Sequence, residues 1–445
     1  MRERLDAWLF ALLLLAGAGC IAFLSTRYGV AYDWTAHARA SLSSESRDVL
    51  KSLKGPVAIT SYASPGTGLR GTISAFVARY QRFKPDLTLR FVDPATDPAG
   101  LRARGIRLDG ELVVRYAGRE QHLDELSERS LTDALARLGR GGDRVVAFVG
   151  GDGERRPDGH ANADLGLFMT ELAARGIRAL PLDLDRSGAV PGHTDLVVLA
   201  SPQAQLAPQA VQALRRYVDD GGNLLWLTEP DSAGLGLAPL AQTLGVQTLP
   251  GTLVDPRDAA AGLPDARMQV VTAYPPQTIT RGFALTTLFP HAAALAHRAG
   301  SGWAVQPILR SAAASYTAHQ ADAGAPPPYD AGAGDLRGPL DFGYALTRLS
   351  PSPAKSQQRV VVLGDGDFLS NSFLGNGGNR AFGERVFNWL LGDDALVAMP
   401  ARGAPDRHLA LGQRGLDALA LVFLIALPLV LAGFGAALAW RRRRR

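Results

Sequence analysis

The chain has 445 residues, of which 47% are apolar and 20% are charged. Its net charge of +5 equals the charge of the five arginines at 441–445, so the rest of the chain is electrically balanced. Basic stripes with interleaved aromatic residues are absent from the sequence, which argues against a nucleic-acid partner. The single cysteine, Cys20, excludes an intramolecular disulfide and leaves the remaining chain without a thiolate nucleophile.

Two long apolar runs lie near the ends of the chain. Ala7–Leu24 contains 18 residues and Ala418–Trp440 contains 23, and neither run contains a charged residue. About 20 apolar residues in a helix cross the hydrocarbon core of a bilayer. We therefore predict an N-terminal transmembrane anchor within residues 1–27 and a second transmembrane helix at 416–440, with the lipid bilayer as a partner.

The charges that flank these runs predict their orientation. Five arginines follow Trp440 directly, whereas only Arg414 lies just before the second run, so the positive-inside rule places the basic tail at 441–445 in the cytoplasm. Two crossings then place the N-terminus in the cytoplasm as well. We expect a two-pass protein of the cell inner membrane whose bulk is extracytoplasmic, in the periplasm.

The first run has a second interpretation, namely a leader that is cleaved or lipidated at Cys20. The apolar run continues past Cys20 to Leu24, which favours an uncleaved anchor. Both interpretations leave the folded region outside the cytoplasm.

Residues 28–141 form the first part of the predicted folded region. A juxtamembrane stalk at 28–55 contains a helix at Glu45–Leu53, and a small α/β domain follows at 56–141. The order β-α-β-β-α suits a thioredoxin-like domain, although a redox role would require a pair of cysteines. The predicted strands are Val57–Tyr62, Leu87–Val92 and Glu111–Tyr116, and the predicted helices are Thr72–Phe83 and Ser130–Leu138.

A larger domain is predicted at 142–395, followed by a linker at 396–415. Nearly continuous apolar strands alternate with amphipathic helices, which indicates a doubly wound parallel sheet with an insertion at about 245–350. The strands are Arg144–Val149, Ala179–Leu184, Asp195–Ala200, Asn223–Leu227 and Arg359–Leu363, and the helices are Asp164–Arg175, Ala207–Asp219 and Ala381–Leu391.

Polar residues follow three of these strands, and doubly wound sheets bind ligands at the carboxyl ends of their strands. The candidate ligand-binding residues are Gly151, Asp152, Gly153, Glu154, Ser201, Gln203, Asp365, Asp367 and Asn371.

Each candidate also has a purely structural interpretation. The glycine turn at 150–154 could bind an anion, but it lacks the spacing of a dinucleotide-binding loop and the lysine of a P-loop. Ser201 lies where a nucleophile elbow would lie, but it lacks the flanking glycines and is followed by Pro202. Asp365 and Asp367 lack the spacing of an EF-hand and would also suit a tight turn. We predict no catalytic residue, no metal site and no cofactor.

Several ordered segments resemble the gliding-motility-type (GldG-like) auxiliary components of ABC transporters. Asp219-Asp220-Gly221-Gly222-Asn223 is similar to the family's step from helix to strand, and Phe91-Val92-Asp93-Pro94 to a motif of its first domain. The most specific stretch runs from Val361 through Gly364-Asp365-Gly366-Asp367 to Asn371, followed by Asn376-Gly377-Gly378-Asn379 and Asn388-Trp389-Leu390.

This resemblance implies a fold for the second domain that is related to class I glutamine amidotransferases. It also implies separate permease and ATPase subunits as partners. Enzymes of that fold use a cysteine nucleophile, whereas Cys20 lies in the first apolar run, so the chain would be a pseudoenzyme. Family members often have Gly-His-Gly-Glu where this chain has Gly151-Asp152-Gly153-Glu154.

Our leading hypothesis is a non-enzymatic auxiliary subunit of an ABC transport system that binds a solute or a partner protein outside the membrane. The chain has no G-x-x-x-x-G-K-[ST] motif, so a separate polypeptide would have to hydrolyse ATP. The alternatives are a stand-alone extracytoplasmic solute-binding receptor and a hydrolase that uses Ser201 or the pair Asp365 and Asp367.

Overall fold

A computed structural model describes most of the chain between residues 41 and 397. The described residues are 17, 41–66, 68–96, 101, 104–230, 232, 235–257, 265–319, 327–353, 356–397, 423, 428–430, 433, 435 and 440–441. The two apolar runs predicted to cross the membrane lie almost entirely outside these residues. Among the described residues, no helix combines the length and the apolar character that crossing a bilayer requires.

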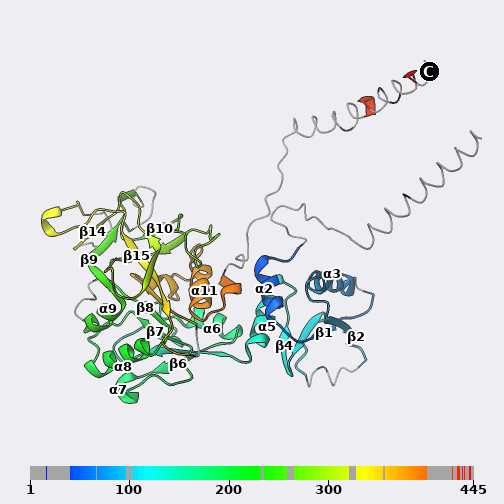
Figure 1. Cartoon of the computed structure of the whole chain (residues 1–445), viewed down its shortest axis with the longest axis horizontal. Helices are drawn as coiled ribbons and strands as arrows, with labels where there is room; N and C mark the ends of the chain where they lie inside the picture. Colours follow the sequence, from blue (N-terminus) through cyan, green and yellow to red (C-terminus); the bar gives the residue numbers. More distant parts are fainter. Residues whose placement is uncertain are drawn as a thin grey trace, which may run out of the picture. The chain divides into compact units, whose positions relative to one another are not determined.

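The first part of the chain forms a four-stranded sheet with helices packed against it (Figure 1). The strand order is β2-β1-β3-β4, in which β1 and β2 are parallel and the other neighbours are antiparallel. A buried apolar core joins the sheet to its helices. The elements are α2 (Ser44–Ser52), β1 (Val57–Tyr62), α3 (Leu69–Gln81), β2 (Leu87–Val92), β3 (Glu111–Tyr116), β4 (Arg119–Leu123) and α5 (Glu128–Arg140).

The three strands predicted here are confirmed with the same bounds, and the structure adds β4. This strand reads Arg119-Glu120-Gln121-His122-Leu123 and is mostly half-exposed, so it lacks the apolar alternation that marks a strand in sequence. It forms because it pairs with β3 along its whole length. Helix α3 begins three residues earlier than predicted, after Gly68 in the left-handed conformation (φ 71°), and its first residue Leu69 packs against the small core.

The second part of the chain contains a seven-stranded sheet in the order β13-β15-β16-β8-β7-β5-β6. From β16 to β6 the neighbouring strands are parallel. Its alternating units are β5 (Arg144–Val149), α6 (Gly166–Ala174), β6 (Ile177–Leu182), α7 (Leu184–Ser187), β7 (Leu196–Ala200), α8 (Pro208–Asp219), β8 (Leu224–Leu227), α9 (Ala238–Leu244), β16 (Gln357–Leu363), η3 (Asp367–Leu369), α11 (Asn379–Leu390) and α12 (Asp394–Val397).

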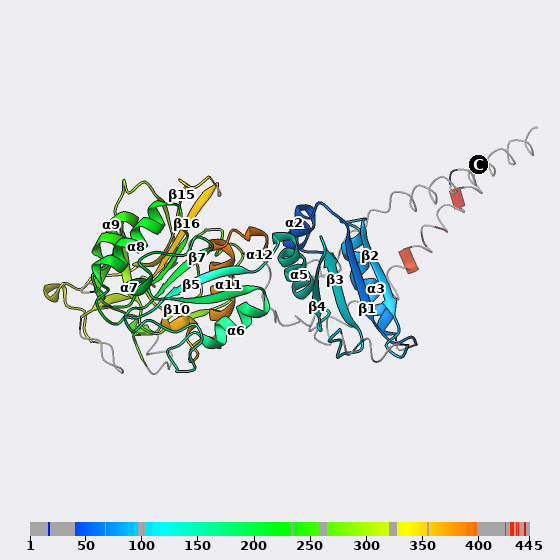
Figure 2. The same cartoon turned by 90° about the horizontal axis from the view of Figure 1, so that it is seen from below.

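Helices cover both faces of the parallel part of this sheet (Figures 1 and 2). One face packs against α6 and α11, through residues such as Phe168 and Phe387. The opposite face packs against α8 and α9, through residues such as Leu214 and Leu240. Successive residues of β7 belong alternately to the two cores, which explains why the strand is apolar throughout.

The segment predicted as an insertion contributes to the large sheet as well as to smaller sheets. Strand β15 pairs antiparallel with β16, and β13 pairs antiparallel with the other side of β15. Strands β9, β12 and β14 form a three-stranded sheet, and β10 and β11 form a hairpin-like pair. The bounds are β9 (Val246–Val254), β10 (Gln269–Val271), β11 (Thr287–Phe289), β12 (Ala293–His297), β13 (Ala304–Arg310), β14 (Tyr316–Ala318), η2 (Ala331–Ala333) and β15 (Asp341–Leu349).

Buried ion pairs join the two α/β parts. Glu384 of α11 is 5% exposed and pairs with Arg129 of α5 and with Arg175, which follows α6. Asp393, between α11 and α12, pairs with Arg140 at the end of α5. Leu396 of α12 belongs to the apolar core of the first part. The segment after the large sheet therefore packs back against the small one.

Residues 400–445 form a separate unit. The described residues of this unit, 423, 428–430, 433, 435 and 440–441, are all helical.

Candidate functional site

Charged side chains gather where four parallel strands end. Arg155 lies in the loop that follows β5, Ser201 follows β7 directly, Glu229 comes two residues after β8, and Asp365 and Asp367 follow β16. The strands are neighbours in the order β16-β8-β7-β5, so their carboxyl ends lie along one edge of the sheet. We refer to Arg155, Ser201, Glu229, Asp365 and Asp367 as the strand-end cluster.

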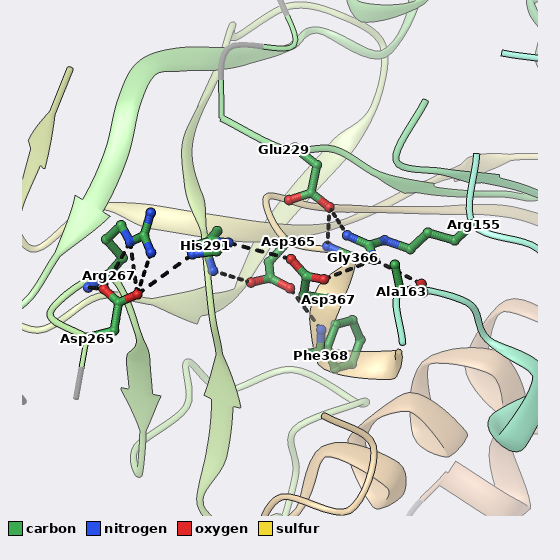
Figure 3. Close-up of polar contacts among 10 residues, drawn as sticks. All are labelled: Arg155, Ala163, Glu229, Asp265, Arg267, His291, Asp365, Gly366, Asp367 and Phe368. Carbon is green, nitrogen blue, oxygen red and sulfur yellow. Dashed lines mark hydrogen bonds and ion pairs between the residues drawn. The ribbon is translucent and has the colours of Figure 1, made fainter. Parts of the chain in front are cut away.

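Arg155 holds the cluster together through both ends of its guanidinium group (Figure 3). Nη2 donates to Glu229 Oε1 at 2.9 Å, and Nη1 lies 2.9 Å from Asp367 Oδ1. Nη1 also donates to the carbonyl oxygen of Ala163 at 2.9 Å. The arginine side chain is only 9% exposed. One buried cation therefore bridges the loops that follow β8 and β16.

Asp365 is fully buried, and backbone groups occupy both of its carboxylate oxygens (Figure 3). Oδ1 accepts from the N–H of Phe368 at 2.9 Å, and Oδ2 accepts from the N–H of His291 at 3.0 Å. The first bond shapes the turn into η3, and the second attaches the loop between β11 and β12. Asp365 is thus a structural anchor that ties the smaller sheets to the strand ends.

His291 extends the cluster away from the large sheet. Its Nδ1 lies 3.8 Å from Asp367 Oδ2, and its Nε2 lies 3.9 Å from Asp265 Oδ2. Arg267 is bound to the same Asp265 carboxylate at 2.5 Å. The imidazole is 41% exposed, so this side of the cluster reaches solvent. A line of acidic and basic side chains thus runs outward from Arg155 (Figure 3).

Burial and neighbouring charges shift the pKa values within the cluster. Burial raises the pKa of Asp365 well above its usual range, and the charges of Glu229 and Asp367 raise it further. Burial also raises the pKa of Glu229, although Arg155 opposes this effect. Burial acts to raise the pKa of Asp367, but His291 and Arg155 outweigh burial and the net shift is downward. Asp367 therefore holds its proton less tightly than Asp365 and Glu229 do, beside the guanidinium of Arg155.

Ser201 and Gly366 meet at the centre of the cluster. A Cβ atom placed on Gly366 would lie 2.1 Å from Ser201 Oγ and 3.1 Å from Arg155 Nε, so only glycine fits between them. Ser201 itself has a left-handed backbone (φ 53°), which is uncommon for a residue other than glycine and costs of order 1–3 kcal/mol. The sharp turn at Ser201 is the one feature of a nucleophile elbow that the site shows.

The predicted residues after β5 and β7 form a tight, hydrogen-bonded pair of loops. Gly151 and Gly153 have positive φ angles of 131° and 83°. The carbonyl oxygen of Asp152 accepts from the N–H of Gln203 at 2.9 Å, and Glu154 Oε2 accepts from the N–H of Asp152 at 2.8 Å. The side chain of Glu154 and the backbone of Gln203 therefore bind the backbone groups of Asp152 within this turn.

Asn371 lies apart from the other predicted residues and fixes the start of α6. Its Oδ1 accepts from the N–H of Leu167 at 2.9 Å, and its Nδ2 donates to the carbonyl oxygens of Ala161 and Gly159 at 2.8 and 3.2 Å. These contacts use both hydrogen atoms of the amide. The geometry accounts for Asn371 as a structural residue.

Sequence reasoning missed Arg155, Glu229 and His291. Arg155 follows Glu154 directly, and Glu229 is a charged residue after a strand of four buried residues, so their positions at strand ends could have indicated both. His291 comes from the segment between β11 and β12, and nothing in its local sequence indicates that it reaches Asp367.

The cluster has the composition of a polar binding site. Ser201 is completely buried, and its hydroxyl lies beside the carboxylate of Glu229, whose pKa it helps to lower. Groups of three or more His, Cys, Asp or Glu residues suited to a metal ion do not occur among the described residues. Three buried polar atoms after these strands lack a partner among the described residues: Glu154 Oε1, Arg155 Nε and Ser370 Oγ.

Comparison with known proteins identifies the family. Residues 143–391, more than half of the chain, match the family described as an ABC-type uncharacterized transport system. The chain belongs to this family of auxiliary components of ABC transport systems. No curated protein matches the chain significantly.

Several solved structures are distantly similar to parts of the chain. The N-terminal domain of mmIFT52 aligns with 55% of this chain and 97% of its own length, at 15% identity and a TM-score of 0.41. A putative ThuA-like protein from Bacteroides uniformis aligns with 58% of this chain and 93% of its own, at 10% identity and a TM-score of 0.30. A mutant thioredoxin from Halobacterium salinarum aligns with 21% of this chain and 84% of its own, at 18% identity and a TM-score of 0.16. These scores are too low to support further conclusions.

Proposed function

We propose that this chain is a non-enzymatic, membrane-anchored auxiliary subunit of an ABC transport system. In this proposal its folded region lies outside the cytoplasm and binds a solute or a partner protein. Membership of the family is the observation that carries the proposal. The absence of a P-loop motif from these 445 residues agrees with an ATPase that is a separate polypeptide.

Two finer assignments belong to the same proposal. We infer a thioredoxin-like small domain, supported by the βαβ unit of β1, α3 and β2 followed by the β3–β4 hairpin and α5. We infer an amidotransferase-like second domain of the gliding-motility type, supported by the parallel sheet with helices on both faces. The cysteine nucleophile of such enzymes has no counterpart at the strand ends, because the chain's only cysteine is Cys20.

Copurification from membranes tests the proposal. The full chain with an affinity tag is extracted in mild detergent, and the proteins that purify with it are identified by mass spectrometry. We expect a multi-span permease and an ATPase in roughly constant ratio to the tagged chain. A chain that purifies alone after cross-linking in intact membranes would contradict the proposal.

The membrane topology is tested separately. A reporter that is active only in the cytoplasm is fused after Arg445, and the same reporter is fused within the loop near Ala331. We expect activity from the first fusion and none from the second. The reverse pattern would refute the orientation predicted from the terminal arginines.

The second candidate function is a stand-alone solute-binding receptor. The unpartnered buried atoms after β5 and η3 favour it, because a polar solute could satisfy them. In this case ligand binding persists when no transporter subunit is present. A hydrolase that uses Asp365 is disfavoured because backbone N–H groups occupy both of its oxygens, and one that uses Ser201 is disfavoured because that residue is completely buried.

A further inference from the structure

A pocket of about 520 Å³ opens beside the large sheet, apart from the strand-end cluster. Its walls come from Trp226 of β8, from α9, from the start of β9 and from the end of β12. We call it the Trp226 pocket. Its volume lies within the range of about 300–1,000 Å³ that is usual for small-molecule sites. The pocket is therefore large enough for a small organic ligand.

The inner wall of the pocket is apolar. Trp226, Leu237 and Val246 are at least 96% buried and belong to the core on this face of the sheet. The indole Nε1 of Trp226 has no hydrogen-bond partner, whereas the neighbouring Trp303 donates its Nε1 to the carbonyl oxygen of Thr243 at 3.1 Å. The wall thus contains a buried donor that the described protein groups leave unpaired.

The outer wall is polar and carries the positive charge of Arg298. Its polar side chains include Gln242, Gln247, His297 and Arg298, and the described residues that line the pocket include no Asp or Glu. The guanidinium of Arg298 forms no hydrogen bond or ion pair with any residue that the structure describes. An exposed cation beside an apolar wall attracts an anion that also has an apolar part.

We propose that the Trp226 pocket binds a small amphipathic organic anion. Its apolar body would lie against Trp226 and Val246, and its carboxylate or similar acidic group would lie at Arg298. This proposal rests on the solute-binding part of the proposed function, for which it names a site and a ligand class. Neither the residues that predicted a site from sequence nor the strand-end cluster contribute to this pocket.

Two naphthalene derivatives of nearly equal shape test the proposal. The full chain, reconstituted in nanodiscs, is titrated by calorimetry with 2-naphthoate and with the neutral 2-naphthamide, and empty nanodiscs provide the blank. We expect saturable binding of one 2-naphthoate per chain, at least tenfold tighter than binding of 2-naphthamide. Failure of 2-naphthoate to saturate, or equal affinity for both compounds, would overturn the proposal.

Variants assign the binding to the pocket. Arg298→Gln should remove the tenfold preference for 2-naphthoate and leave 2-naphthamide binding unchanged, and Ala238→Trp should block both compounds. Arg281→Gln is the matched control, because Arg281 is also exposed and lies outside the pocket lining. Equal losses in Arg298→Gln and Arg281→Gln would refute the assignment.

A charge variant covers the case in which Ala238→Trp does not fold. Gln242→Glu places an acid on the exposed surface of α9 and should weaken only 2-naphthoate binding, with an unchanged melting temperature. The outcomes separate the two proposals. Loss of 2-naphthoate binding with an intact permease complex would overturn this inference alone, whereas binding by a chain that purifies alone would overturn the transporter assignment alone.

Discussion

Glu229 shows how burial and charge compete at a single residue. Its carboxylate accepts hydrogen bonds from Arg155 and from the N–H of Gly366, at 2.9 and 3.2 Å. Burial nevertheless raises its pKa, and it also raises the pKa of the neighbouring Asp365. The folded protein therefore binds protons at these two carboxyl groups more tightly than the unfolded chain does.

This pKa shift predicts a pH-dependent effect of Glu229→Gln. Consider a carboxyl group whose pKa is higher in the folded protein than in the unfolded chain. As the pH rises from the unfolded pKa towards the folded pKa, this group lowers the free energy of unfolding. Glutamine resembles the protonated acid, so the variant should avoid this loss of stability. We expect the stability of the variant relative to the wild type to increase from pH 5 to pH 8. The increase is about 1.4 kcal/mol for each tenfold difference in the proton affinity of Glu229 between the folded and unfolded states.

Denaturant unfolding at both pH values measures this difference. Glu120→Gln is the control, because Glu120 is half-exposed and pairs with Arg115 at the surface. The stability of Glu229→Gln relative to the wild type could instead stay constant or fall as the pH rises. Either result would show that the pKa of Glu229 is not raised in the folded protein.

Gly366 illustrates a steric requirement rather than an electrostatic one. Gly366→Ala places a methyl group 2.1 Å from Ser201 Oγ, and such overpacking costs about 1–3 kcal/mol. We expect a loss of this size in the free energy of unfolding. Gly150→Ala is the matched control, because nothing lies within 4 Å of its Cβ position.

A second substitution identifies the clash. Ser201→Gly removes the hydroxymethyl group and accepts the left-handed backbone at this position. In this background Gly366→Ala should cost less than in the wild type. Equal costs in the two backgrounds would mean that Ser201 is not the obstacle.

At the scale of elements, charged helices join the two α/β parts. Glu384 on α11 faces Arg129 on α5 and Arg175 after α6, and Asp133 lies 3.9 and 3.8 Å from the same two arginines. Burial raises the pKa of Asp133 despite both arginines. Burying such charges contributes little net stability, whereas removing one partner leaves the others uncompensated.

We therefore expect Glu384→Gln to destabilise the protein strongly, by about 3–5 kcal/mol. Glu171→Gln provides the comparison, since Glu171 pairs with the half-exposed Arg380 and a surface pair contributes at most about 1 kcal/mol. Thermal unfolding of the full chain measures both variants. Similar melting temperatures for the two variants would contradict a structural role for the buried pairs.

At the scale of the whole molecule, the first and last helices of the region 41–397, α2 and α12, contact each other. Ser46 of α2 hydrogen-bonds Glu128 and Thr132 of α5 at 2.6 and 2.9 Å, and Leu396 of α12 packs into the same apolar core. The chain therefore enters and leaves this folded region beside the small sheet. If both ends cross the membrane, as the sequence predicts, the two tethers attach near one point of the fold.

Leu396→Ala tests this convergence. The side chain is 8% exposed, and truncation of a buried leucine costs about 2–5 kcal/mol. Leu349→Ala should change stability by no more than about 0.5 kcal/mol, because Leu349 is 88% exposed. An equally small effect at Leu396 would show that α12 does not contribute to the core of the small domain.

Local sequence determined those parts of the fold whose signal is local. The strands β1, β2, β3 and β5 have the predicted bounds, because each is a short run rich in apolar residues with a glycine, proline or charged residue directly before it. The glycine-rich turns and the helices of the doubly wound sheet follow from the same kind of pattern. The family resemblance likewise depended on ordered motifs, and the family match over residues 143–391 supports it at the level of auxiliary components of ABC transport systems.

Only the tertiary structure decided which residues meet. Pairing with β3 makes β4 a strand, and antiparallel pairing with β16 brings β13 and β15 into the large sheet. The fold brings together Arg155, Glu229, His291 and Asp367, although each is between 62 and 76 residues from the next one in sequence. A local pattern cannot specify such contacts, because they depend on the order in which the strands lie side by side.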